Sequence, residues 1–253
     1  MGNKRVLSVV MPAYNEGKTI STVLTQLVEL DCVKEIIVVD DGSQDGTGEM
    51  VRRFDSPLVK LIVMPTNQGK TAAVRRGLEE VQGEITIIQD ADLEYDPKEI
   101  PLVIEPILIG RADVVYGSRF LVRKTARVLY FYHFLANKFL TFLSNLLTNL
   151  NMTDIETCYK AFRTPLIKNL PLTSRGFGME VEITAMISKT QARIYEVPIS
   201  YYGRTYAEGK KVRFKDGVMA LWYTLFFNLV GSRFKRARNY VKIANESLKV
   251  SGR

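Results

Sequence analysis

The sequence predicts an α/β fold in which a mainly parallel β-sheet is flanked by helices. Short apolar segments alternate with longer segments whose apolar residues recur at helical spacing, which is typical of strand–helix–strand units. Polar motifs follow four of the apolar segments, as expected where the strands of a parallel sheet end beside a ligand. The 253 residues are 46% hydrophobic and 25% charged, a composition typical of a globular protein.

The first half of the chain supplies the expected sheet. The first strand, VLSVVM, is rich in Val and ends at Pro12. In chain order, strands are predicted at residues 6–11, 35–39, 59–64, 84–89 and 112–116. Helices are predicted between them, at residues 18–30, 45–54, 69–81 and 96–109. Because parallel strands end at one edge of a sheet, we expect that edge to gather Asp40, Asp41, Asp90 and Asp92.

The second half has a different character. Residues 127–150, RVLYFYHFLANKFLTFLSNLLTNL, are predicted to form an amphipathic helix that is too polar for a membrane span. Further α/β elements are expected at 180–189 and 194–197, before a basic loop at 204–215. The apolar run at 218–230 has 13 residues, fewer than the roughly 20 that cross a bilayer. Basic residues then dominate the tail: Arg233, Lys235, Arg236, Arg238 and Lys242.

The net charge of +8 favours an anionic partner. Three classes of partner fit this charge: nucleic acid, an acidic membrane surface and a phosphorylated small molecule. Nucleic acid is disfavoured because no strand or helix interleaves aromatic and basic residues. Cys32 and Cys158 stand far apart without metal-ligand spacing, and we expect two inert, buried thiols in a reducing compartment.

Two aspartates close the fourth predicted strand, in the segment IIQDADLEYDP. Asp90 and Asp92 are separated by one residue, so both can point toward a hard divalent cation that also binds phosphate oxygens. On its own, the pattern is also compatible with a solvated acidic turn before the helix that opens at Asp96-Pro97.

Four motifs on four successive strands are more specific than any one of them. They are PAYNE at residues 12–16, VDDGS at 39–43, NQGK at 67–70 and DAD at 90–92. With these motifs the sequence resembles the family-two glycosyltransferases, which have the GT-A nucleotide-diphospho-sugar transferase fold. Among them it is most similar to the dolichyl- or polyprenyl-phosphate sugar synthases, such as the dolichyl-phosphate mannose synthases. The resemblance covers nearly the whole chain.

The resemblance implies a donor site and a metal site at these motifs. The residues that it assigns to the base and ribose of a nucleotide sugar are Pro12, Tyr14, Glu16, Val39 and Asp41. Those that it assigns to the rest of the donor are Lys70, Asp90, Ala91 and Glu180. The implied ligands of Mg²⁺ or Mn²⁺ are Asp90, Asp92 and Glu94.

The resemblance also implies the catalytic residues, which are Asp92, Asp154, Arg119, Arg204 and Lys210. Arg119 stands in GSR, Asp154 in DIETCYKAFR, and the last two are spaced six apart in RTYAEGK. An acceptor phosphate is already ionised near neutral pH, so a general base is not required. Arg119, Arg204 and Lys210 would hold the donor diphosphate and the acceptor phosphate together, while the metal stabilises the departing diphosphate. His133 is expected to serve packing.

The implied reaction is the inverting, metal-dependent transfer of mannose or glucose to dolichyl or polyprenyl phosphate. GDP-mannose and UDP-glucose both remain open as donors. The implied catalytic domain covers residues 1–217, with an amphipathic acceptor-side segment at about 123–150, while residues 218–253 form an amphipathic helix and a basic tail. We expect a peripheral protein at the cytoplasmic face of a membrane, with amphipathic interfacial helices. A membrane subunit or a second copy is a further expected partner.

Three alternatives remain. A family-two glycosyltransferase could act on a soluble or saccharide acceptor, but the amphipathic segments and the paired basic loop disfavour it. A non-catalytic lipid- or polyanion-binding protein could use the same fold, but the intact aspartates disfavour it. The apolar helix faces could also be core or dimer contacts rather than membrane contacts.

Overall fold

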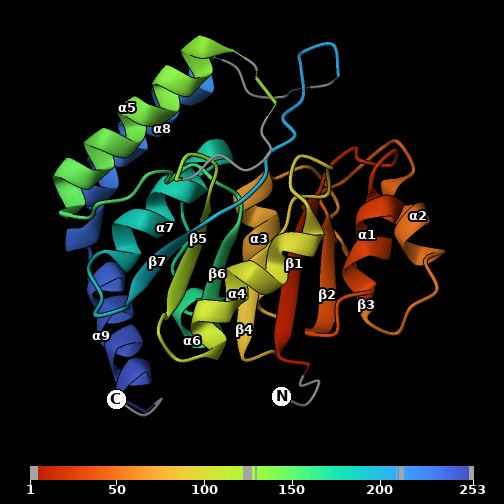
Figure 1. Cartoon of the computed structure of the whole chain (residues 1–253), viewed down its shortest axis with the longest axis horizontal. Helices are drawn as coiled ribbons and strands as arrows, with labels where there is room; N and C mark the ends of the chain where they lie inside the picture. The colour runs from red at the N-terminus through yellow and green to blue at the C-terminus, as the bar shows by residue number, and fades with distance from the viewer. Residues whose placement is uncertain (1–4, 122–126, 129, 209, 211–213, 251–253) are drawn as a thin grey trace.

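The computed structural model describes residues 5–121, 127–128, 130–208, 210 and 214–250. The basic positions Arg123, Lys124, Lys211 and Arg213, which the sequence places beside the amphipathic segments, lie outside the described residues. Within those residues, helices flank a single seven-stranded sheet (Figure 1). This confirms the predicted α/β class.

The elements follow one another along the chain in an alternating order. The strands are β1 (Leu7–Ala13), β2 (Val33–Asp40), β3 (Val59–Val63), β4 (Ile85–Ile88), β5 (Val114–Ser118), β6 (Lys160–Arg163) and β7 (Ile194–Pro198). The α-helices are α1 (Ile20–Val28), α2 (Thr47–Arg52), α3 (Lys70–Leu78), α4 (Ile100–Leu108), α5 (Phe131–Thr148), α6 (Thr164–Lys168), α7 (Met179–Ile187), α8 (Phe214–Leu229) and α9 (Lys235–Val250). Short 3₁₀ turns cover Pro97–Glu99, Gly176–Gly178 and Gly231–Arg233.

The sheet is mainly parallel, with one exception that the sequence did not reveal. The strand order is β3-β2-β1-β4-β6-β5-β7. β6 runs antiparallel to both β4 and β5, whereas the other pairs are parallel. β6 is only four residues long and lies within the DIETCYKAFR motif, so no strand-length apolar run announces it.

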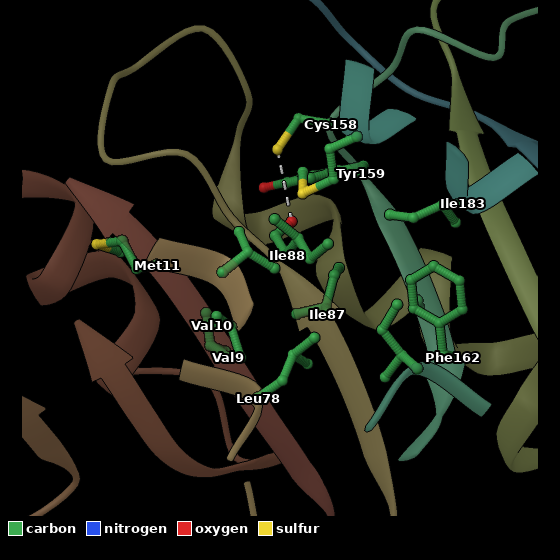
Figure 2. Close-up of a cluster of buried hydrophobic side chains, with 14 of the residues drawn as sticks. Val9, Val10, Met11, Leu78, Ile87, Ile88, Cys158, Tyr159, Phe162 and Ile183 are labelled. Atoms are coloured by element: carbon green, nitrogen blue, oxygen red, sulfur yellow. Dashed lines mark hydrogen bonds between the residues drawn. The ribbon is translucent and has the colours of Figure 1, made fainter. Parts of the chain in front are cut away.

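The centre of the sheet is the core of the molecule. β1 and β4 are buried along their whole length, where α3 packs against β1 and α6 contacts β4. Figure 2 shows side chains of β1, β4 and β6 gathered with Leu78 of α3 and Ile183 of α7. This continuous core fixes the positions of the strand ends.

The C-terminal segment is more ordered than the predicted basic tail. It forms the amphipathic helix α9, whose buried positions recur at helical spacing: Ala237, Tyr240, Ala244 and Leu248. These side chains belong to the same hydrophobic cluster as the sheet. Among the described residues, the segment after residue 217 therefore shares the hydrophobic core of the sheet. The division of the chain into a catalytic domain and a C-terminal part stays a prediction.

Helices α5 and α8 form a pair that lies outside α7 (Figure 1). The helix predicted at 127–150 begins at Phe131, and the one predicted at 218–230 already begins at Phe214. Large apolar side chains stay exposed on both helices: Phe131, Tyr132, Leu135, Phe142 and Leu146 of α5, and Val218, Met219 and Trp222 of α8. Among the described residues, no helix combines the length and the apolar character needed to span a bilayer.

The turn after β2 depends on a glycine that holds the strand-end motif in place. Gly42 has φ +73°, and a Cβ there would lie 2.9 Å from the Asn67 nitrogen. Gly110 has the same φ but no atom within 4 Å of its Cβ position, which makes it a matched control. We expect Gly110→Ala to lower the free energy of unfolding by about 1–2 kcal/mol and Gly42→Ala by roughly 2–5 kcal/mol, as measured by urea unfolding. Equal losses would show that the close approach to Asn67 does not matter.

Candidate active site

The polar motifs of the sequence meet at one edge of the sheet, as predicted. β1 is paired in parallel with β2 on one side and with β4 on the other, so these three strands end side by side. Asp40 is the last residue of β2, Asp41 follows it, and Asp90 and Asp92 follow β4. The loop at Arg204 approaches the same edge, since its side chain reaches Asp92.

Asp41 holds the loop that follows β3. Its two carboxylate oxygens accept hydrogen bonds from the backbone N–H groups of Gln68 at 2.8 Å and Gly69 at 2.7 Å. Asp41 is only 3% exposed, although each oxygen keeps a further lone pair. Asp41 therefore joins two of the strand-end motifs, and its predicted contact with the base or ribose stays a prediction.

The other residues assigned to the base and ribose differ in how they are presented. Tyr14 is exposed and Glu16 is half-buried, whereas Pro12 is buried in β1. Val39 is fully buried and faces Gly77 of α3, so its side chain serves the core. The carbonyl oxygen of Ala91 accepts a hydrogen bond from the Thr19 hydroxyl at 2.8 Å.

Lys70 joins two of the predicted donor-binding carboxylates. It begins α3, and its ammonium lies 2.9 Å from an oxygen of Asp90 and 3.1 Å from Oε1 of Glu180 at the start of α7. Burial alone would raise the pKa of Asp90, but the Lys70 charge lowers it below its ordinary value. The same carboxylates raise the pKa of Lys70 despite its burial, so this group stays charged.

Arg204 gathers the remaining acidic residues of this edge. Its guanidinium donates to Asp92 at 2.6 Å and to Glu94 at 3.2 Å, and it lies 3.5 Å from Glu16. Glu94 also accepts a hydrogen bond from the Tyr201 hydroxyl at 2.9 Å. The Arg204 guanidinium, from a segment far along the chain, therefore pairs with the carboxylates of Asp92, Glu94 and Glu16.

The negative charge at Asp92 is only partly compensated. Burial raises the pKa of Asp92 to about 7, and the charges of Asp90 and Glu94 act in the same direction, against the attraction of Arg204. A divalent cation at this position would relieve that crowding, and carboxylate oxygens are the ligands that Mg²⁺ and Mn²⁺ prefer. The chemistry of Asp90 and Asp92 therefore fits the implied metal ion.

The third predicted metal ligand, Glu94, is bound by other side chains. Within the described part of the chain, no group of three or more His, Cys, Asp or Glu residues is gathered closely enough to hold a metal ion. Glu94 is engaged by Tyr201 and Arg204. Asp90, Asp92 and Glu94 stay a predicted ligand set, in which oxygens of a diphosphate would complete the coordination of the ion.

Arg119 and Asp154 form a buried ion pair. Arg119 donates from Nε and Nη2 to the two carboxylate oxygens at 2.7 and 2.8 Å, a bidentate geometry. Asp154 is fully buried, and the Arg119 charge holds its pKa below the ordinary value although burial opposes this. Arg119 also lies 5.1 Å from the ring centre of Tyr201. In this arrangement Asp154 positions Arg119, while a direct contact of Asp154 with a substrate stays a prediction.

A cavity of about 520 Å³ connects the polar edge with the α5 and α8 helices. Its polar lining includes Lys70, Asp90, Glu94, Arg119, Glu180 and Lys210. Its apolar lining comes from α5 and α8 and includes Phe139, Leu140, Ala220 and Leu221. Asp92 and Arg204 are not among the lining residues. The cavity therefore combines charged groups suited to phosphate with a wall suited to an apolar chain.

Lys210 is the least compensated cation of this cavity. Burial and the neighbouring Arg119 and Arg204 charges lower its pKa, although Glu94 opposes them. Its ammonium lies 5.6 Å from the ring centre of Tyr130, and it makes no ion pair with any residue that the structure describes. His133 lines the same cavity, and its Nε2 is 2.9 Å from the Tyr206 hydroxyl.

Three residues near the site escaped the sequence reasoning. Tyr201 binds Glu94, and its ring lies near Arg119. Glu156 lines the cavity, and Lys160 is buried near the carboxylates of Glu180 and Glu156. Glu156 and Lys160 stand within the DIETCYKAFR motif, two residues to either side of Cys158. Charged residues in a buried segment are unusual, and that was the available signal.

Comparison with known proteins assigns a family. A family model described as Glycosyl transferase family 2 matches residues 8–170. The undecaprenyl-phosphate mannosyltransferase of Micrococcus luteus is 30% identical over 219 residues, which cover 81% of this chain and 87% of that protein. The dolichol-phosphate mannosyltransferase of Pyrococcus furiosus is 30% identical over 209 residues, 81% of this chain but only 58% of the archaeal protein.

Solved structures share the fold at lower identity. Glucosyl-3-phosphoglycerate synthase from Mycobacterium tuberculosis in complex with UDP has a TM-score of 0.69 at 21% identity, over 88% of this chain and 80% of that chain. The same synthase in complex with Mn²⁺, UDP and glucosyl-3-phosphoglycerate has a TM-score of 0.67 at 22% identity, over the same shares of the two chains.

Proposed function

The chain belongs to glycosyl transferase family 2, and from this premise we propose that it transfers a hexose from a nucleotide diphosphate sugar to a polyprenyl phosphate. It is a glycosyltransferase with the GT-A fold, and its curated relatives are named as mannosyltransferases for undecaprenyl phosphate and dolichol phosphate. Mannose and glucose are the sugars proposed, carried by GDP and UDP respectively. The proposed product is a lipid-phosphate-linked hexose with an inverted anomeric centre.

The observation that carries this proposal is the composition of the cavity. Its polar lining contains Lys70, Arg119 and Lys210 together with acidic groups, and its apolar lining comes from side chains of α5 and α8. A polyprenyl phosphate has the same two parts, a dianionic head and a hydrocarbon chain. A soluble phosphorylated acceptor would leave the apolar wall without a partner.

A divalent cation is proposed as the cofactor. Mn²⁺ and UDP are bound together in structures of glucosyl-3-phosphoglycerate synthase, which shares the fold. Here Asp90 and Asp92 would hold Mg²⁺ or Mn²⁺, which would neutralise charge on the donor diphosphate as it departs.

The protein side chains would bind and orient two anions. Arg204 is held by Asp92, Glu94 and Glu16 next to the position proposed for the diphosphate, to which it would transfer its contacts. Lys210 is free to pair with the acceptor phosphate. Arg119 lines the same cavity and is held rigidly by Asp154. Because the acceptor phosphate is ionised near neutral pH, its oxygen can attack the anomeric carbon without a protein base. The main contribution of the site is electrostatic.

The α5 and α8 helices are proposed to lie on a membrane surface, where the phosphate of the acceptor is found. Their exposed side chains include aromatic residues, which favour the interfacial region of a bilayer. We propose peripheral association with the cytoplasmic face, where anionic lipids would attract a chain of net charge +8. A membrane subunit or a second copy of the chain is a further proposed partner.

Exposed side chains of α5 provide a test of this association. Phe142 and Leu146 are 64% and 69% exposed. We expect Phe142→Ser with Leu146→Ser to weaken binding to anionic vesicles at least about tenfold, because both side chains would otherwise be buried in lipid. Leu108→Ser, at an exposed apolar position of α4, is the control and should bind normally in a sedimentation assay. Equal binding by all three proteins would assign the α5 face to another contact.

The proposed reaction is tested by following labelled sugar into lipid. The purified chain in detergent receives radiolabelled GDP-mannose or UDP-glucose, a short polyprenyl phosphate, and Mn²⁺ or Mg²⁺. Label in the organic phase that requires both the metal and the acceptor supports the proposal and names the donor. Release of label only into water-soluble products would overturn it.

A further inference from the structure

Two glutamates that line the cavity, here called its floor, each have a carboxyl oxygen without a hydrogen-bond partner among the described residues. Glu156 and Glu180 both line the cavity, and Oε1 of Glu156 and Oε2 of Glu180 are buried without a hydrogen-bond partner among the described residues. Glu180 is only 4% exposed. A buried acceptor without a partner is costly, so such atoms usually mark the place of a bound ligand or water.

The cations around these two glutamates do not bind the unsatisfied oxygens. Lys70 binds the other oxygen of Glu180, Oε1, and also Asp90. The ammonium of Lys160 donates to the carbonyl oxygen of Thr157 and lies 5.1 Å from the ring centre of Tyr116. Burial raises the pKa of Glu156 to about 8, and the nearby Glu180 charge adds to this. Near neutral pH, Glu156 can therefore both accept and donate a hydrogen bond.

The chemistry of this floor selects among the parts of the substrates. A phosphate would be repelled by the carboxyl oxygens, and a hydrocarbon chain would leave them unsatisfied. Hydroxyl groups supply the missing donors and can also accept a hydrogen bond from the protonated carboxyl group of Glu156. Because Glu180 is bridged to Asp90 through Lys70, the floor lies next to the proposed diphosphate position, where the hexose of the donor must be.

We propose that Glu156 and the free oxygen of Glu180 form a hydroxyl-binding subsite for the donor hexose, and that Glu156 determines which hexose is accepted. This inference rests on the proposed function, since it requires a nucleotide sugar as donor. It adds a specificity residue that the strand-end motifs do not contain.

The test measures the contribution of single hydroxyl groups to donor binding. Calorimetry with Mn²⁺ compares UDP-glucose and GDP-mannose with their monodeoxy-hexose analogues, without acceptor and without transfer. In the unmodified protein, at least one analogue of the accepted donor should bind about 10- to 100-fold more weakly. In Glu156→Ala that difference should fall to about twofold, because the hydroxyl has lost its partner. Glu156→Gln keeps the side-chain size and should retain part of the difference.

Glu182→Gln is the matched control. Glu182 is also buried on α7, but it accepts hydrogen bonds from Thr173 and Ser174 and does not line the cavity. Its substitution should leave the difference between donor and analogue unchanged. A difference that persists in Glu156→Ala, or that is absent from the unmodified protein, would overturn the inference and leave the proposed function standing. Failure of every nucleotide sugar to bind would overturn both.

Discussion

Asp92→Asn is expected to lower kcat for sugar transfer by about 10³-fold or more. Asp92 is the aspartate at which negative charge is least compensated, since burial and its acidic neighbours raise its pKa to about 7. The amide keeps the shape of the side chain but removes the charge that would hold the metal ion. Initial rates measured against Mn²⁺ concentration provide the comparison.

Asp96→Asn is the control for this substitution. Asp96 follows in the same loop, and its carboxylate accepts a hydrogen bond from the Lys98 nitrogen at the start of a helical turn. The Asp96→Asn substitution should lower the stability of the protein slightly and leave the metal dependence of sugar transfer unchanged. If Asp92→Asn transfers sugar at the normal rate and with normal Mn²⁺ dependence, Asp92 does not hold the metal.

Arg204→Ala is expected to lower transfer by about 10²- to 10³-fold while strengthening the binding of Mn²⁺ in the absence of nucleotide severalfold. The two effects have one cause. Arg204 donates to Asp92 and Glu94, so it competes with a metal ion for these carboxylates until a diphosphate offers it a better partner. Free Mn²⁺ can be measured by electron paramagnetic resonance during titration of the protein.

Arg76→Ala is the charge-matched control, because the ion pairs of Arg76 with described residues are those with Glu79 and Glu80 on the surface of the molecule. It should change neither transfer nor Mn²⁺ binding. Weaker Mn²⁺ binding by Arg204→Ala would mean that the guanidinium supports the metal site rather than competing with it. Normal transfer by that variant would remove Arg204 from the phosphate-binding groups.

Local patterns were sufficient to predict the site edge of the sheet. The alternating apolar segments predicted β1, β2, β3 and β4. Because parallel strands end at one edge of a sheet, Asp41, Asp90 and Asp92 were then expected to lie at that edge. The Lys70 ion pairs with Asp90 and Glu180 fit the resemblance, which assigned all three residues to the donor.

Contacts between distant segments could not be predicted in this way. The bidentate Arg119–Asp154 pair joins positions 35 residues apart, and Arg204 reaches Asp92 across 112 residues. Neither spacing has a periodic signature, because both contacts depend on how segments distant in the sequence are brought together by the sheet order β3-β2-β1-β4-β6-β5-β7. The unsatisfied oxygens of Glu156 and Glu180 could not be predicted for a similar reason, because an unsatisfied oxygen is visible only when its surroundings are known.

The most direct test of the proposed lipid acceptor is a competition between acceptors. The purified chain is supplied with labelled donor, Mn²⁺ and equal concentrations of a short polyprenyl phosphate and 3-phosphoglycerate, and the labelled products are separated. The cavity, whose lining combines cations with apolar side chains of α5 and α8, predicts that nearly all the sugar is transferred to the lipid phosphate. Transfer mainly to 3-phosphoglycerate would contradict the account and would assign the apolar wall to packing.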